Sequence, residues 1–267
     1  MRRISIVLLV LFACLVAAPM RLAAQQHTHG KCSVATLKGT FGTFEQGTVV
    51  ADIGFGPPPF PAVVAGTITY DGAGNFTSTF SANFNGIPFT SAATGTYLVN
   101  PDCTYSDSVP STDSNGAGII TGEGTEQEVH FVYTGGSVLA AGTLKKIRPF
   151  ACSEHSVKGR FGLFGEGTFA PAGTPLLANH VGIVTFDGFG HFYGQETVNV
   201  GGAPTTQTNF TGTYTVTSDC TVTAEIVSPV MPPIHEAGVI TGAGMNLEIH
   251  NIVMDPGWTF ADTLTPQ

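Results

Sequence analysis

The stretch TGTYTVTSDCTV at residues 211–222 has a near-copy, TGTYLVNPDCTY, at residues 94–105. In the later copy threonines alternate with Tyr214 and Val216, and beyond the turn Cys220 begins a second alternation of apolar and polar residues. A two-residue period of this kind is typical of strands with one face toward solvent and the other toward a core. Both stretches therefore predict β-hairpins with an apolar inner face.

The turns of these hairpins have a predicted length. If Val216 and Cys220 lie opposite each other on the core face, an odd number of residues connects them, which predicts a three-residue turn at 217–219. The segments GTITYDGAGNF (66–76) and GIVTFDGFGHF (182–192) behave alike, because an odd number of residues separates their flanking aromatics. Asp-Gly predicts a hairpin turn there and not a calcium loop, since one carboxylate stands among glycines.

The repetition extends from residue 32 to the end of the sequence. CSVATLKGTFGTF at 32–44 aligns without gaps to CSEHSVKGRFGLF at 152–164, and AGIITGEGTEQEVH at 117–130 matches AGVITGAGMNLEIH at 237–250. A unit of about 115 residues is a normal single domain and is too long for one solenoid repeat. The predicted organisation is a signal peptide at 1–24, a flexible tail at 25–31, one domain at 32–148, a linker at 149–151 and a second domain at 152–267.

Each unit contains about eight strand segments in sequence order, separated by turn residues. Charged residues make up only 11% of the chain and Gly and Thr are abundant, which favours strands and tight turns over helices. An open sheet of this size exposes two edges, and closure into a barrel removes them. The sequence predicts an all-β fold of two tandem antiparallel meander β-barrels of about eight strands each, with β-sandwiches as the alternative.

The first residues have the three-part form of an export signal. Arg2 and Arg3 precede an apolar run at 4–18, and Ala24 offers a cleavage point before Gln25. The run is about 15 residues long, whereas a membrane span needs roughly 20. The mature chain is expected to be exported to the periplasm or the cell exterior without a membrane span, and an uncleaved N-terminal anchor is the alternative.

Charge and motifs narrow the classes of function. Removal of the signal leaves 7 basic and 19 acidic residues, a net charge of −12. This balance argues against nucleic acid and anionic membranes as partners, because both bind clustered Lys and Arg. Serine-nucleophile, zinc-protease and phosphate-loop motifs are missing from the sequence. We therefore expect a protein without a cofactor that is not an enzyme.

Four cysteines remain outside the signal, two per unit at equivalent positions: Cys32, Cys103, Cys152 and Cys220. Four cysteines allow three pairings. Duplication selects Cys32–Cys103 and Cys152–Cys220, because each domain should close itself, and export supplies an oxidising compartment. Distant single cysteines without a CxxC motif disfavour a zinc site. The sequence predicts two structural disulfides.

Histidines supply the remaining candidates for chemistry. Glu128 and His130 recur as Glu248 and His250, and the two-residue period puts each pair on one strand face. A carboxylate beside an imidazole can tune a general base, and a solvated polar face is the alternative. His27 would be the third residue of the mature chain, where amine, amides and imidazole could bind Cu(II) or Ni(II). A disordered polar tail is the alternative for His27.

The motifs FDGxGxF and GTYxVxxDCT together resemble those of a group of exported, functionally uncharacterised proteins of soil bacteria, whose domains occur singly or in tandem. The resemblance covers both units, and its motifs consist of turn and strand residues, so it implies no catalytic residues. The closed meander is also similar to calycin-type barrels such as the lipocalins, although 38–41 and 158–161 lack the tryptophan of the lipocalin start. That similarity implies a ligand inside the barrel.

The leading interpretation is an exported, non-enzymatic tandem β-barrel protein that binds a small apolar ligand. The alternatives are a structural or adhesive component of the cell envelope, and an enzyme that uses the Glu128/His130 and Glu248/His250 strands. A lumen above roughly 300 Å³ would favour ligand binding, and a barrel filled by aromatics would argue against it. The candidate cavity residues are Tyr70, Phe76, Tyr97, His130, Phe186, Phe192, Tyr214 and His250.

Overall fold

The computed structural model describes residues 32–147, 151–170, 174–203, 206–229, 231–242 and 244–267. The predicted signal peptide (1–24), the predicted tail with His27 (25–31) and most of the predicted linker (149–151) lie outside the described residues. Within the described ranges, no helix is long and apolar enough to cross a membrane.

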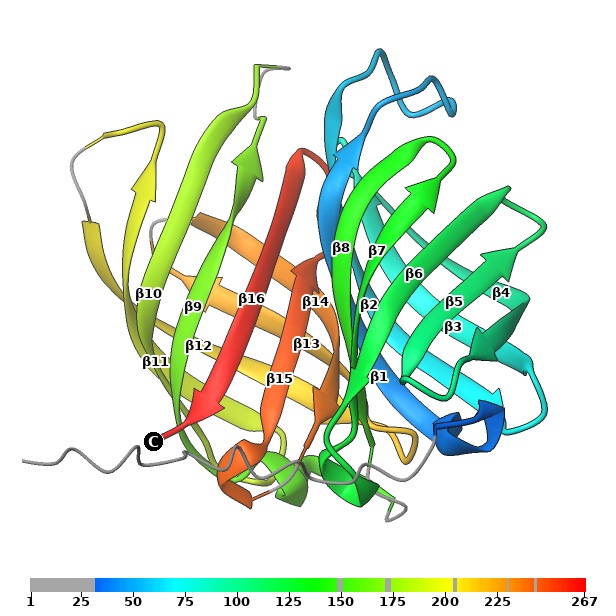
Figure 1. The fold of residues 1–267 in the computed structure, drawn as a ribbon. Helices are drawn as coiled ribbons and strands as arrows, with labels where there is room; N and C mark the ends of the chain where they lie inside the picture. Colours follow the sequence, from blue (N-terminus) through cyan, green and yellow to red (C-terminus); the bar gives the residue numbers. More distant parts are fainter. Residues whose placement is uncertain (1–31, 148–150, 171–173, 204–205, 230, 243) are drawn as a thin grey trace, which may run out of the picture. The chain divides into compact units, whose positions relative to one another are not determined.

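The first eight strands form a closed antiparallel barrel in which each strand pairs with the next and β8 pairs with β1 (Figure 1). A short 3-10 helix, η1 (Val34–Leu37), precedes the barrel, and another, η2 (Gly124–Glu126), joins β6 to β7. The strands are β1 (Lys38–Val49), β2 (Phe60–Asp71), β3 (Asn75–Phe84), β4 (Ile87–Val99), β5 (Thr104–Val109), β6 (Ser114–Thr121), β7 (Glu128–Gly135) and β8 (Val138–Lys146).

The next eight strands form a second closed barrel of the same connectivity, in which β16 pairs with β9. Its 3-10 helices are η3 (Glu154–Val157) and η4 (Gly244–Asn246). The predicted fold class, two tandem antiparallel meander barrels, is confirmed, and the β-sandwich alternative is wrong. The strands are β9 (Gly159–Phe169), β10 (Leu176–Phe186), β11 (His191–Val200), β12 (Thr206–Val216), β13 (Thr221–Ser228), β14 (Met231–Thr241), β15 (Glu248–Val253) and β16 (Trp258–Pro266).

The Asp-Gly segments are hairpin turns, as predicted. Tyr70 pairs with Phe76 across the β2–β3 turn, and Asp71 Oδ1 accepts hydrogen bonds from the backbone N–H groups of Ala73 and Asn75. Hydrogen bonds from the Asn75 side chain and backbone lower the pKa of Asp71 to about 2. The β10–β11 turn is built alike: Phe186 pairs with Phe192, and Asp187 accepts from the N–H groups of Phe189 and His191.

The hairpin between β12 and β13 differs from its prediction by one residue. Val216 lies opposite Val222 and not opposite Cys220, so the three-residue turn is 218–220. Cys220 adopts a left-handed conformation, with φ of 68°, and thereby closes the turn as its third residue. The predicted odd length is confirmed and the predicted register is wrong, because a residue expected in the strand belongs to the turn.

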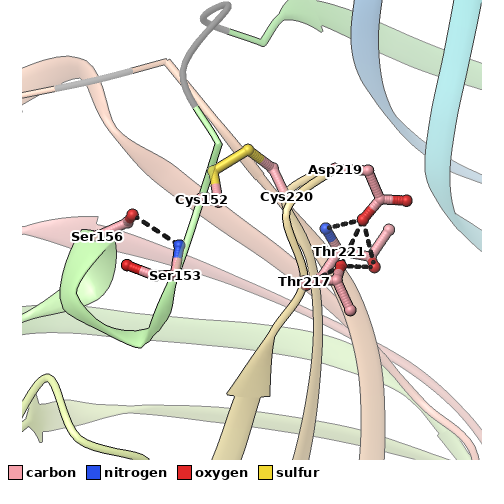
Figure 2. The surroundings of a disulfide bond; sticks show 7 residues. All are labelled: Cys152, Ser153, Ser156, Thr217, Asp219, Cys220 and Thr221. Atoms are coloured by element: carbon pink, nitrogen blue, oxygen red, sulfur yellow. Dashed lines mark hydrogen bonds between the residues drawn. A yellow bond between two sulfur atoms is a disulfide. The ribbon is translucent and has the colours of Figure 1, made fainter.

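The two predicted disulfides are present. Cys32 bonds to Cys103 and Cys152 bonds to Cys220, each with a Cα–Cα distance of 5.0 Å. Figure 2 shows Cys152 beside η3 and Cys220 in the turn that Asp219 caps. Each disulfide thus joins the segment before the first strand of its barrel to the fourth hairpin connection of the same barrel.

The 3-10 helices at the start of each barrel pack into its apolar interior. Leu37 of η1 and Val157 of η3 are both fully buried, each in the core cluster of its own barrel. Tyr97 donates its hydroxyl to the Val34 carbonyl at 2.8 Å, and Tyr214 donates to the Glu154 carbonyl at 3.0 Å. A tyrosine hydroxyl and a disulfide therefore hold each helix against its barrel.

An apolar contact joins outer faces of the two barrels. Val63 and Ala65 of β2 pack with Ile252 of β15 and Ala261 of β16, and all four are buried. The outer faces of these strands are therefore covered, and β15 buries side chains on both of its faces.

Candidate ligand site in the second barrel

The interior of the second barrel has a polar layer between two apolar layers along its strands. Near η3, the inward side chains are aromatic or aliphatic and form one buried cluster. Further along the same strands, the inward positions carry a group that we call the polar cluster: His180, Glu196, Glu236, Asn251 and Asp262. These five residues come from β10, β11, β14, β15 and β16, so the closed sheet brings together residues up to 82 positions apart.

His180 is held by carboxylates on both sides of its ring. Its Nδ1 lies 2.7 Å from Glu196 Oε2 and its Nε2 lies 2.6 Å from Asp262 Oδ1. The side chains of Glu196 and Asp262 are only 6% and 2% exposed. Burial alone lowers the pKa of His180, but Asp262 and Glu196 together raise it to about 10. At neutral pH, His180 is therefore an imidazolium that donates both of its N–H groups.

Glu236 and Asn251 complete the polar cluster. Burial, and then the neighbouring Asp262, raise the pKa of Glu236 well above its ordinary value. Asn251 donates from Nδ2 to Glu236 Oε2 at 2.9 Å. Asn251 is 6% exposed, and its Oδ1 has no hydrogen-bond partner among the described residues. A buried acceptor without a donor is costly, so this oxygen is an acceptor that a bound molecule could satisfy.

A cavity of about 40 Å³ lies between the polar cluster and the apolar layer. Its aromatic wall consists of Phe186, Phe192, Phe210 and Tyr214. The volume accommodates about three water-sized groups, since one such group needs roughly 10–15 Å³ measured in this way. The lumen is therefore far smaller than the roughly 300 Å³ expected for a drug-sized ligand, yet the aromatics do not fill it.

Glycine at one inward position makes the ion pair possible. A Cβ atom at Gly165 of β9 would overlap Asp262 Oδ1 and His180 Nε2. A Cβ atom at Gly238 of β14 would likewise overlap Asn251 Oδ1. Neither glycine has a positive φ, so both are explained by close side-chain approach and not by backbone conformation.

The first barrel also contains partly buried carboxyl groups, but in a different arrangement. Tyr133 donates its hydroxyl to Glu45 Oε2 at 2.8 Å, and Tyr105 donates to Asp107 Oδ2 at 2.5 Å. Burial raises the pKa values of both Glu45 and Asp107. Tyr70 shares a hydrogen bond of 2.8 Å with the Tyr105 hydroxyl, so three phenols surround the two acids.

The two interiors differ at equivalent register positions. Glu45 pairs with Val64 across β1 and β2, whereas the corresponding pair in β9 and β10 is Gly165 with His180. The positions that hold the polar cluster in the second barrel hold, in the first, Val64, Phe80, Gly116, Phe131 and Gly142. The same strand framework thus forms with and without these polar residues, so the framework does not require them.

The predicted cavity residues divide into inner and outer groups. Phe186, Phe192 and Tyr214 line the cavity. Three further aromatics are buried inside the first barrel: Tyr70, Phe76 and Tyr97.

His130 and His250 do not lie in a lumen, which corrects the expectation for these two residues. His130 is exposed on the outer face of β7, 3.3 Å from Glu128. His250 is buried on the outer face of β15, where it stacks on Phe44 at 4.7 Å and lies 3.0 Å from Glu248. The contact with the first barrel, and not a lumen, explains the burial of His250.

The polar cluster contains none of the residues singled out from the sequence, because none of its members recurs in both units. Alternation along the strands could have placed two of these residues inside the barrel. His180 is an even number of positions from the inward residues Val184 and Phe186, and Asp262 is two positions from the inward Leu264. Neither the family models nor the curated proteins compared with this chain give a match. Fold and site define a tandem β-barrel protein with a small amphipathic cavity in its second barrel.

Proposed function

We propose that this chain is an exported, non-enzymatic binding protein whose second barrel holds a small molecule in its interior. The observation that supports binding is the cavity between the aromatic wall and the polar cluster, with Asn251 Oδ1 left without a donor. Ligand sites commonly combine an apolar lining with a few converging polar groups. The similarity of the closed meander to calycin-type barrels supports the same location by analogy of fold.

The energetic cost of the polar cluster supports a role beyond folding. Burial of charged groups in a protein interior carries a desolvation penalty that hydrophobic residues of similar size avoid. The first barrel closes with apolar residues or glycine at the same register positions. A function inside the lumen accounts for the retention of a group that the fold does not need.

Export is proposed on two features. The first residues carry the basic start, apolar run and small residues of a signal peptide. Both barrels contain a disulfide, and such bonds persist in oxidising compartments outside the cytosol. The periplasm and the cell exterior both satisfy this requirement.

Native mass spectrometry of the full chain purified from its own host tests the binding function. We expect a retained small molecule, which Ala224→Val should displace, because Ala224 lines the cavity and added methyl groups would fill it. Thr223→Val is the matched control, since Thr223 is exposed on the outer face of the same strand. Retention that is equal in both variants would place the molecule elsewhere.

Two other outcomes would favour the alternative functions. A recurrent partner protein without a bound small molecule would support the envelope component. A catalytic activity that is lost in His130→Ala and His250→Ala would support the enzyme. Either result would overturn the proposed binding function.

A further inference from the structure

We infer that the molecule held in the second barrel is a small protonated alkylamine, whose ammonium group contacts the polar cluster and whose alkyl group contacts the aromatic wall. This inference rests on the proposed function and specifies the chemical class of its ligand.

The polar cluster offers mainly acceptors, because only one N–H of the Asn251 amide is a donor without a partner among the described residues. Both N–H groups of His180 are directed to carboxylates, one N–H of Asn251 Nδ2 is directed to Glu236, and the carboxyl group of Glu236 is hydrogen-bonded to Asp262. The acceptors that remain are Oδ1 of Asn251, a residue that lines the cavity, and lone pairs of carboxyl oxygens, each of which can accept more than one hydrogen bond. A ligand that completes this set must donate hydrogen bonds, as the three N–H groups of an ammonium do.

The charges around the cavity select a cation. Three carboxyl groups, those of Glu196, Glu236 and Asp262, surround a single imidazolium, and the cavity lining contains no Lys or Arg. Even with Glu236 protonated, the carboxylates of Glu196 and Asp262 outnumber the imidazolium by one, and with Glu236 ionised the excess is two negative charges. Tyr214 is the other titratable residue of the lining, and its hydroxyl donates to a backbone carbonyl. An anionic ligand would be repelled in this low-dielectric interior, whereas an ammonium supplies the missing positive charge.

The aromatic wall and the cavity volume limit the rest of the ligand. The rings of Phe192 and Phe210 lie 6.2 Å apart, centroid to centroid, and give the cavity an apolar side. A short alkyl chain gains free energy by leaving water for such a surface, and an ammonium near ring faces gains a cation–π contribution. Space for about three water-sized groups corresponds to an amine of three to four heavy atoms, such as propylammonium.

Binding of a cation should release a proton. Burial and Asp262 raise the pKa of Glu236 and so favour the protonated form of its carboxyl group. A positive charge placed beside this carboxyl group favours its ionised form. The enthalpy of ammonium binding is therefore expected to depend on the ionisation enthalpy of the buffer, with a proton released from the protein.

A series of ligands of similar size tests the inference on the full chain. Trp258 is the single tryptophan of the chain and lies 6.1 Å from Phe260, which in turn packs edge-on against His180, so its fluorescence can report on the cluster. We expect propylammonium to bind at least tenfold more tightly than 1-propanol at pH 7, and propionate not to bind. Isothermal titration in two buffers would detect the released proton.

The outcomes separate this inference from the proposed function. If 1-propanol or propionate binds as tightly as propylammonium, the ligand class is wrong and the binding function stands. If none of the three binds and no molecule is retained from the host, both are wrong.

Variants provide an independent test of the polar cluster. Glu236→Gln should weaken propylammonium binding about tenfold, which corresponds to loss of a charge-assisted hydrogen bond, and should abolish the buffer dependence. Glu225→Gln is the control, because Glu225 is exposed on the outer face of β13. Binding and proton release that are unchanged in Glu236→Gln would overturn the inference. The ligand series needs no variant, so the inference stays testable even if Glu236→Gln does not fold.

Discussion

Gly165 determines whether the ion pair of His180 and Asp262 can form. A strand interior ordinarily favours alanine over glycine, because glycine loses more conformational entropy on folding. At Gly165 this preference is reversed, since a methyl group would overlap both charged side chains. The stability of Gly165→Ala therefore reports on the polar cluster and not on backbone propensity.

We expect Gly165→Ala to lower the free energy of unfolding by roughly 1–3 kcal/mol, the usual cost of overpacking. Gly162→Ala in the same strand is the control, because there the nearest atom to a new Cβ belongs to the flexible side chain of Gln267. Urea unfolding of both variants provides the measurement. Equal stability of the two variants would contradict the proposed packing.

Removal of one partner of the buried ion pair should be more damaging. Asp262→Ala leaves the His180 imidazolium with one carboxylate, and breaking a buried pair in this way costs roughly 3–5 kcal/mol. The pKa of His180 should fall as well, since Asp262 is its strongest charged partner. Urea unfolding and NMR titration of the imidazole test both effects; an unchanged pKa of His180 would argue against the pairing.

The raised pKa of His180 predicts how stability depends on pH. Its folded pKa of about 10 exceeds the ordinary histidine pKa of about 6.5, so its contribution is complete below pH 6.5 and is lost as the pH rises toward 10. The raised pKa of Glu236 likewise makes the folded protein less stable as the pH rises above the ordinary pKa of a glutamate. Between pH 7 and 10, unfolding free energy should decline more steeply in the native chain than in His180→Gln. His191→Gln, at an exposed position, should retain the native slope.

At the level of the strands and turns, the two-residue period predicts the strands, and the cost of exposed sheet edges predicts their closure into barrels. The period identified the inward aromatics and the Asp-Gly turns because both follow from local alternation and turn chemistry. The register at Cys220 was not predictable in this way, since residues other than glycine seldom adopt a left-handed conformation. The residues of the polar cluster occupy alternate strand positions that face inward, as the two-residue period predicts. Local sequence does not indicate, however, which inward polar residues the closed sheet brings together.

The disulfides should stabilise each barrel to a similar extent. Cys152 and Cys220 are 68 positions apart and Cys32 and Cys103 are 71 positions apart, so the chain-entropy model gives about 4 kcal/mol for each. Replacement of either pair by serine should lower the free energy of unfolding by this amount, measured with urea. A much smaller loss in one pair would show that its denatured chain is already constrained.

For the whole molecule, the contact between the barrels explains what the sequence could not assign. The two-residue period of a strand predicts that Glu248 and His250 share one face, but side chains on both faces of β15 are buried. Alternation alone does not distinguish a face turned to the lumen from one covered by the other barrel. The assignment of His250 depends on Phe44, which is more than 200 positions earlier in the chain.

The apolar contact between the barrels should make them unfold together. Ile252 is fully buried against Val63 and Ala65, and Ile252→Ala should lower stability by roughly 2–5 kcal/mol. Differential scanning calorimetry should show one transition for the native chain and two for this variant. Val227→Ala, at an exposed position of β13, should leave the single transition intact. Two transitions in the native chain would show that the contact does not couple the barrels.

The different interiors of two barrels with one strand plan have an evolutionary consequence. Side chains that point inward take no part in the backbone ladder that closes a barrel, so one copy can acquire a new specificity while the other retains its own. Such a gene could diversify without a new fold. For protein engineering, the two barrels offer two interiors on one polypeptide that can be redesigned separately. The five residues of the polar cluster could be introduced at the equivalent positions of the first barrel, together with glycine in place of Glu45.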